Sequence, residues 1–181
     1  MSEQIKTRRL RLKSWEQGHF APFAEMHADE EVMADLGGAL DLAASHSKFE
    51  RYREALRQHG ISRWAVEDLE GRFIGYAGVM PRLSPGHPLG AHYEVGWRLV
   101  RRAWGHGYAT ESARAALDDA NNRLGITGII SYTGAENVRS QSVMRKLGLV
   151  RRSSLDFVQQ APGGGTWHGL VWSVDNPKCG G

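Results

Sequence analysis

The second half of the chain alternates between two hydrophobic periods, and this order limits the possible folds more than any other feature. Residues 92–100 and 126–133 have the alternating or β-branched patterns of strands. Residues 109–124 and 138–147 instead carry apolar side chains at helical spacing, and a glycine follows each run. An order of strand, helix, strand, helix, strand predicts a mixed sheet with helices on both faces.

Two helices and two strands are expected before that unit. Residues 16–36 and 42–59 have helical patterns, and Asp41 and Gly60 are typical start and stop residues for the second helix. Residues 61–67 and 72–80 read as strands. The turn-forming sequence Asp-Leu-Glu-Gly between these two strands predicts a hairpin.

The two ends of the chain complete the expected sheet. Leu10 and Leu12 alternate with basic residues, which predicts a first strand. Residues 149–159 and 166–174 predict the last two strands, separated by a glycine-rich segment at 162–165. The order is then β-α-α-β-β-β-α-β-α-β-β, an α/β (α+β) arrangement that we expect to form one domain over residues 1–181.

Composition excludes several classes of protein. The single cysteine, Cys179, rules out a disulfide framework and any multi-cysteine metal site, so we expect no metal. No signal peptide or membrane-length apolar run is present, which favours a cytoplasmic protein with no membrane partner. The net charge of +3 is too small to indicate nucleic-acid binding. The basic residues of 48–57 and the scattered tryptophans fit a solvated helix face and core packing instead.

A glycine-bearing turn joins the strand at 92–100 to the helix at 109–124. Gly105 and Gly107 allow positive φ angles and a close approach of backbone to ligand. The first N–H groups of the following helix have no helical partner, so the turn can bind a phosphate or pyrophosphate. A dinucleotide fingerprint would need glycine in place of Thr110, and the Gly-Lys-Ser/Thr of a P-loop is absent.

The turn carries the motif Arg102-x-x-Gly105-x-Gly107 followed by Tyr-Ala-Thr-Glu, with Trp104 before the first glycine. This motif resembles the acetyl-CoA signature of the GNAT superfamily of acetyltransferases, and in particular of its RimJ/RimL-like branch. Further matching stretches lie in the same order along most of the chain, at residues 7–12, 73–78, 93–99, 137–140 and 146–148.

The resemblance implies an acetyl-CoA site in a mostly antiparallel sheet whose fourth and fifth strands splay apart in a V. It implies a bulge in the fourth strand, with which Gly96 is consistent. The pantetheine arm would pair with the backbone near Leu99 and Val100. The implied cofactor residues are completed by Arg102, Gly105, His106, Gly107, Tyr108, Ala109, Thr110 and Asn137.

Acetyl transfer to an amine requires the nitrogen to lose a proton. Alternation places His92, Glu94, Gly96 and Arg98 on a polar face of their strand, with an apolar face opposite. Glu94 is the preferred base, because the resemblance places an acid there. The alternatives are a salt-bridged structural role for Glu94, and His92 as the base.

The start of the last helix supplies two further candidates. Asn137 fits an N-cap residue, and the resemblance adds a hydrogen bond to the pantetheine arm. Ser140 falls near the third helical position, where the resemblance has a serine facing the thioester sulfur. Met144 stands where many GNAT enzymes have a proton-donating tyrosine, so Ser140 or water must act if an acid is needed.

These observations predict an N-acetyltransferase that uses acetyl-CoA and acts on a primary amine by direct attack on the thioester. The acceptor can be a protein N-terminus or a small molecule. We expect residues 29–47, 81–90 and 159–167 to shape the site that binds it. A homodimer is possible. The alternative is a non-catalytic acyl-CoA sensor, which the presence of both Glu94 and Ser140 disfavours.

Overall fold

A single sheet of nine strands runs through the molecule. The computed structural model describes residues 4–161 and 164–174, so Pro162, Gly163 and Cys179 lie outside the described part. The strand order is β1-β2-β3-β4-β5-β6-β9-β7, with β8 added beside β9, and only the β5–β6 pair is parallel. The strands are β1 (Gln4–Lys6), β2 (Leu10–Lys13), β3 (Arg63–Asp68), β4 (Phe73–Arg82), β5 (His92–Leu99), β6 (Ile130–Thr133), β7 (Leu149–Arg151), β8 (Phe157–Gln160) and β9 (Thr166–Val174).

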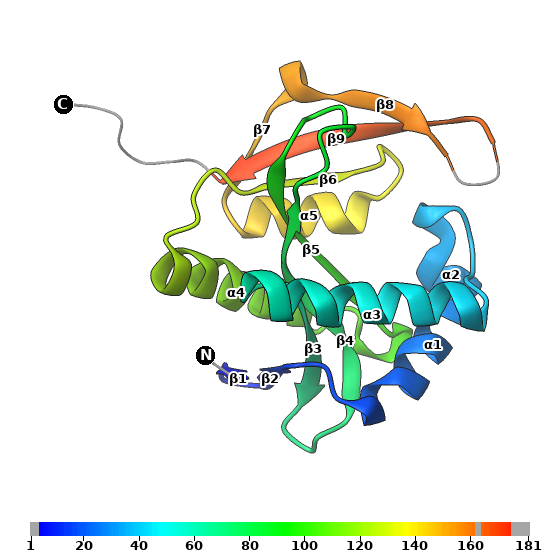
Figure 1. Ribbon diagram of the computed structural model, residues 1–181, viewed down its shortest axis with the longest axis vertical. Coiled ribbons are helices and arrows are strands. Elements are labelled where there is room, and N and C mark those ends of the chain that lie inside the picture. Colours follow the sequence, from blue (N-terminus) through cyan, green and yellow to red (C-terminus); the bar gives the residue numbers. More distant parts are fainter. Residues whose placement is uncertain (1–3, 162–163, 175–181) are drawn as a thin grey trace.

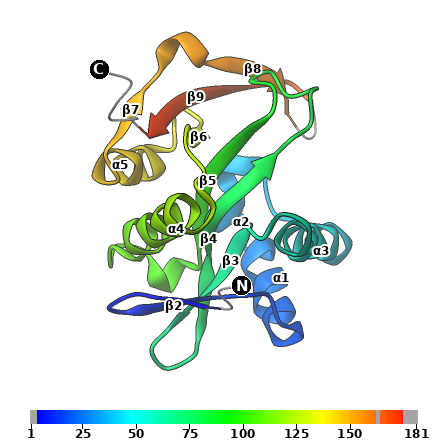
Figure 2. The ribbon, with the colours of Figure 1, turned by 60° about the vertical axis from the view of Figure 1, so that its left-hand side comes forward.

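Helices cover both faces of this sheet, as the sequence predicts (Figures 1 and 2). The α-helices are α1 (Phe20–Ala28), α2 (Glu30–Met33), α3 (Leu42–His59), α4 (Tyr108–Leu124) and α5 (Val138–Lys146). One core cluster joins α1, α2 and α3 to β4, and another joins α4 and α5 to β5. Figure 2 shows α4 and α5 on the side of the strands opposite α1 and α3.

Helix α3 begins and ends where the sequence predicts. The Asp41 carboxylate accepts a hydrogen bond from the N–H of Ala44 (2.8 Å), and Gly60 ends the helix at a φ of 68°. The expected helix over 16–36 is wrong as one element. Asp29 ends α1 with extended backbone, and its side chain accepts from the N–H groups of Glu31 and Val32, which starts α2.

Two strand predictions also need correction. β1 pairs with β2 as a short hairpin that the sequence analysis misses. The strand expected over 149–159 is divided into β7 and β8 by a 3₁₀ turn at Ser153–Leu155. Asp156 stabilises this break, because its carboxylate pairs with Arg151 and accepts from the N–H of Val171.

The parting of β5 and β6 is the feature that positions the site. The two strands pair only at Glu94 and Ile130, so they diverge toward their carboxyl ends, which confirms the expected V. The expected bulge in β5 is wrong, because its ladder with β4 is continuous from His92 to Leu99. The register shift lies instead between β3 and β4, with Ile74 as the additional residue.

Candidate active site

The turn that leads into α4 has the geometry of an anion site. A 3₁₀ turn at Arg101–Ala103 follows β5, and Gly105 and Gly107 then adopt φ angles of 79° and 78°. Gly107 is the N-cap of α4, and the first helical bond runs from the N–H of Glu111 to the carbonyl of Gly107 (3.0 Å). The N–H groups of the first helical turn, residues 108–110, therefore have no helical carbonyl to bond and point out of the helix end.

Contacts from the start of the chain hold this turn in place. The Glu111 carboxylate accepts from the hydroxyl of Thr7 (2.6 Å) and from the backbone N–H and Nε of Arg9 (2.9 and 2.7 Å). Arg9 also donates to the carbonyl of His106 (2.9 Å) and lies over the ring of Tyr108. Partial burial would raise the pKa of Glu111, but these hydrogen bonds outweigh it and hold that pKa below its ordinary value.

Two of the predicted cofactor side chains have partners within the chain. Arg102 donates from Nη2 to the carbonyl of Phe73, the first residue of β4 (2.7 Å). The His106 ring stacks on Tyr108, the first residue of α4. The donors that this turn offers to an anion are therefore the backbone N–H groups of residues 108–110.

The register of β5 decides which of its backbone groups face the V. The N–H of Val100 donates to the carbonyl of Ile74 in β4 (3.0 Å). Because hydrogen-bonded and open pairs alternate along an antiparallel ladder, the backbone groups of Trp97 and Leu99 point toward β6. The hydroxyl of Ser131 in β6 donates to the carbonyl of Val95 (2.8 Å), in agreement with this direction. The backbone of Leu99 therefore faces the V, whereas the N–H of Val100 is already bonded to β4.

The start of α5 lies beside the same opening. Asn137 is its N-cap and accepts from the N–H of Ser140 (3.1 Å), which confirms the predicted cap and the third helical position of Ser140. The Asn137 amide donates to Asp35 (3.0 Å), and Asp35 is paired with Arg98 of β5 (2.9 Å). Asp35 thus joins β5 to α5, and both polar atoms of the Asn137 side chain are engaged. The Ser140 hydroxyl has no hydrogen-bond partner among the described residues.

Glu94 is buried between two arginines. Its Oε1 lies 3.0 Å from Nη2 of Arg63, and its Oε2 lies 2.8 Å from Nε of Arg82. Gly96 makes room for this arrangement, because a Cβ there would lie 2.5 Å from Nη2 of Arg63. Burial alone would raise the pKa of Glu94, but the two guanidinium charges outweigh it and hold that pKa below its ordinary value.

A cluster of rings lies next to Glu94 at the beginning of β5. Nδ1 of His92 lies 2.8 Å from the carbonyl of Gly90, which can only accept, so Nδ1 carries the proton. With that proton on Nδ1, Nε2 is the ring nitrogen left to accept a proton, and it lies 3.3 Å from the hydroxyl of Tyr132. Burial and the negative charge of Glu94 raise the pKa of Tyr132, so the phenol stays protonated. His87 contacts both rings.

The structure thus brings most of the predicted residues to one opening and adds others that the sequence analysis misses. The N-terminal ends of α4 and α5 and the backbone of Leu99 border the V, and Glu94 lies where β5 and β6 pair. The additional residues are Asp35, which bonds Asn137 and Arg98, and the two arginines that pair with Glu94, Arg63 and Arg82. Arg63 begins β3 directly before the apolar run at residues 64–66, and a charged residue next to such a run is a signal that could have indicated a buried ion pair.

Within the described residues, no helix combines the length and apolarity that crossing a membrane requires.

The geometry of Glu94 predicts its effect on stability. Glu94→Gln should lower the free energy of unfolding by about 3 kcal/mol at pH 7, because it leaves Arg63 buried without a counter-charge. Glu50→Gln is the matched control, since it removes a carboxylate from an exposed pair with Arg53 and should cost less than about 0.5 kcal/mol. Denaturant unfolding of the three proteins measures both values.

The same comparison has a pH dependence of known sign. A lowered pKa in the folded protein stabilises it above the ordinary value of 4.5, and this stabilisation is lost as pH falls through the folded-state pKa. The difference between the wild type and Glu94→Gln should therefore shrink below about pH 4.5. An equal cost for Glu94→Gln and Glu50→Gln at pH 7 would contradict a buried charge pair.

Comparison with known proteins agrees with this geometry. The uncharacterized protein YkkB of Bacillus subtilis is 29% identical over 148 residues, which cover 81% of this chain and 84% of YkkB. An acetyltransferase structure from Agrobacterium tumefaciens has the same fold, with a TM-score of 0.79 and 23% identity over 96% of this chain and 94% of that one. A structure of RimL, a ribosomal L7/L12 alpha-N-protein acetyltransferase, gives a TM-score of 0.75 at 12% identity over 95% and 93% of the two chains.

The family model described as "Acetyltransferase (GNAT) domain" matches residues 9–150, which include the turn before α4, the V and the start of α5. The residues present fit the cosubstrate of such a domain, since a helix N-terminus preceded by two left-handed glycines can hold its pyrophosphate. The chain belongs to the GNAT acetyltransferase family and is an N-acetyltransferase that uses acetyl-CoA.

Proposed function

We propose that this protein acetylates a primary amine, either a protein N-terminus or a small molecule, in the manner of the RimJ/RimL-like branch. The observation that carries the proposal is the helix N-terminus of α4, which opens beside the splayed strands β5 and β6. Bound acetyl-CoA supplies an activated acetyl thioester. The Trp104 motif and the fold likeness to RimL support the branch, and the family match gives no support to a non-catalytic sensor.

The backbone of the chain would hold the cosubstrate. The N–H groups of residues 108–110 and the left-handed glycines before them suit the pyrophosphate. The backbone groups of Trp97 and the N–H of Leu99 suit the amides of the pantetheine arm, because they point into the V as those of a strand edge do. The carbonyl of Leu99 already accepts from Nε1 of Trp104 (2.9 Å).

Removal of the amine proton needs a group that is a good acceptor near neutral pH. The family resemblance favours Glu94 as this proton acceptor. Its lowered pKa makes it a weak acceptor toward an ammonium ion, and both of its oxygens already accept from arginines. We therefore assign proton removal to Nε2 of His92, on the same face of β5, which exchanges its long contact with the Tyr132 hydroxyl (3.3 Å) for the amine. Glu94 then fixes the two guanidinium groups.

Ser140 is assigned to the leaving group. Its hydroxyl stands one turn into α5 and has no other partner among the described residues, so it is available to donate a proton to the thiolate sulfur. Met144 cannot donate a proton.

The anion site is tested by two matched glycine substitutions. Gly107→Val should abolish most of the stabilisation by CoA, because the β-branched side chain resists a φ of 78° and its Cβ would lie 3.4 Å from Nη2 of Arg9, which holds the turn in place. Gly125→Val places the same strain, at a φ of 64°, at the opposite end of α4. Differential scanning fluorimetry measures the shift in Tm that excess CoA causes in each protein. CoA at a hundred times its Kd should raise the free energy of unfolding by about 2.7 kcal/mol.

We expect the wild type and Gly125→Val to be stabilised equally by CoA. A folded Gly107→Val protein with an undiminished CoA shift would remove the pyrophosphate site from this turn.

The proton-transfer roles are tested by the pH dependence of kcat with saturating acetyl-CoA and one amine. His92→Gln should lower kcat by about 10²-fold at neutral pH and displace the acid limb of the profile. Glu94→Gln should leave the limb where it is, because Glu94 is ionised throughout the neutral range. Ser140→Ala should lower kcat without displacing the limb, since it acts on the sulfur and not on the amine.

One result would contradict the assignment of proton removal to His92. Loss of the acid limb in Glu94→Gln, with an unchanged profile in His92→Gln, would return the role of base to Glu94.

A further inference from the structure

A large pocket lies on the α3 side of the sheet, away from α4 and α5. It has a volume of about 800 Å³ and is bordered by the second half of α3, the end of β4, the loop 83–88 and β8. Arg82 forms part of its wall, and the Nε of Arg82 bonds Glu94 at the point where β5 and β6 meet. The pocket therefore adjoins the inner end of the V from the face opposite the CoA-binding helices.

The charges around this pocket do not balance. Arg63 and Arg82 share the single carboxylate of Glu94, which leaves an excess of one positive charge in a buried cluster. Arg82 uses only its Nε in this pair, so its two terminal nitrogens remain available toward the pocket. Arg51 on α3 adds a second cation to the lining, and none of the described carboxylates forms an ion pair with it.

The acidic and imidazole groups of the lining do not offset this charge. The Glu54 carboxylate is held by Arg57 (2.5 Å), which lies outside this pocket. Burial and the neighbouring His92 lower the pKa of His87, so this ring is neutral at physiological pH. His59 adds no negative charge.

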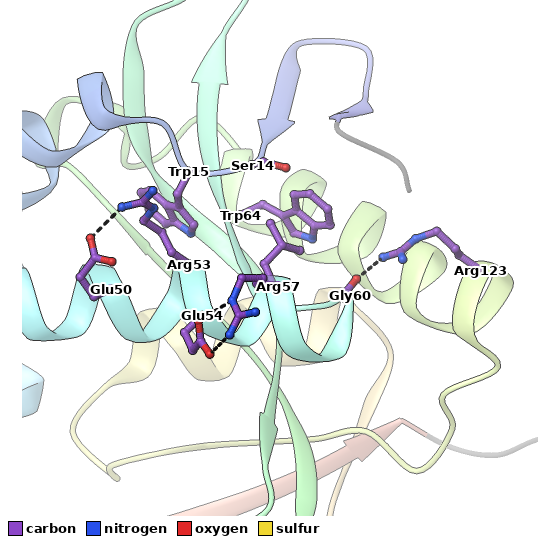
Figure 3. A pocket seen from close by; sticks show the side chains of 10 residues that line it. Ser14, Trp15, Glu50, Arg53, Glu54, Arg57, Gly60, Trp64 and Arg123 are labelled. Atoms are coloured by element: carbon purple, nitrogen blue, oxygen red, sulfur yellow. Dashed lines mark hydrogen bonds and ion pairs between the residues drawn. The ribbon is translucent and has the colours of Figure 1, made fainter.

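A second pocket, of about 360 Å³, shows the contrast (Figure 3). It lies on the other side of α3, over Trp15 and Trp64, and is also rich in arginine. Here each cation is already bonded: Arg53 to Glu50, Arg57 to Glu54, and Arg123 to Asp119 and the carbonyl of Gly60. This pocket carries no excess charge of the kind found beside Glu94.

We propose that the 800 Å³ pocket is the acceptor site and that it takes an amine that also bears an anionic group, a carboxylate or a phosphate. The proposal rests on the proposed acetyl transfer. The anionic group faces Arg82 and Arg51, which offsets the unbalanced charge, and the amine lies toward β5. The same positive field opposes a second ammonium group on the acceptor and favours the neutral form of the attacking amine.

The experiment measures kcat/KM with acetyl-CoA, expressed per unprotonated amine, for pairs of amines with and without an anionic group. L-Phenylalanine is paired with L-phenylalaninamide, and phosphoethanolamine with ethanolamine, so that the two arms separate carboxylate from phosphate. Spermidine tests a polycation. At least one anionic amine should exceed its neutral partner by about tenfold or more, and spermidine should be the poorest substrate.

Two variants of α3 locate the effect. Arg51→Gln should raise KM about fivefold for the preferred anionic amine and leave its neutral partner unchanged. Arg53→Gln is the matched control, because Arg53 is exposed on the same helix but lines the other pocket. In this variant the KM values for the anionic amine and for its neutral partner should stay within about twofold of the wild type. Binding of the same amines to the CoA-loaded protein is measured by calorimetry in parallel.

The outcomes separate the two proposals. Better turnover of the neutral amines or of spermidine, or equal effects of Arg51→Gln and Arg53→Gln, would overturn the anionic acceptor while acetyl transfer stands. Charge-selective binding of amines without turnover of any would support the pocket and refute the proposed function. Neither binding nor turnover of any anionic amine would refute the inference.

Discussion

The parting of β5 and β6 is the constraint on which the rest of the site depends. A sheet interior normally satisfies every backbone N–H and C=O by pairing neighbouring strands. Here the strands pair only at Glu94 and Ile130, so the backbone of Trp97 and Leu99 faces an opening that a ligand with amide groups can complete. The N-termini of α4 and α5 follow the diverging strand ends, so the first turns of both helices lie beside the same opening.

Three charged side chains lie at the inner end of this opening. Glu94 lies at the last β5–β6 pairing and is neutralised by Arg63 and Arg82 together. One carboxylate between two guanidinium groups is held ionised and is a poor proton acceptor, and it keeps both positive charges at this end of the V. This single arrangement links the assignment of proton removal to His92 with the preference for an anionic acceptor.

The sequence predicts the local features well, because they depend on neighbours in the chain. The bounds of α3 follow from Asp41 and Gly60, and the positive φ angles of Gly105 and Gly107 follow from their place before a helix. Tertiary contacts decide the features that it misses. The break at Asp29, the direction of Val100 and the pairing of Glu94 each depend on groups that are distant in sequence or compete with the helix backbone.

Residue-resolved hydrogen exchange with and without CoA tests the central claim most directly, namely that the V between β5 and β6 and the N-terminus of α4 form the cosubstrate site. The account predicts slower exchange of the amides of Trp97, Leu99 and residues 105–110 when CoA is bound, with no change over α3. Slower exchange confined to α3 and the loop 83–88, with β5 and the start of α4 unaffected, would contradict it.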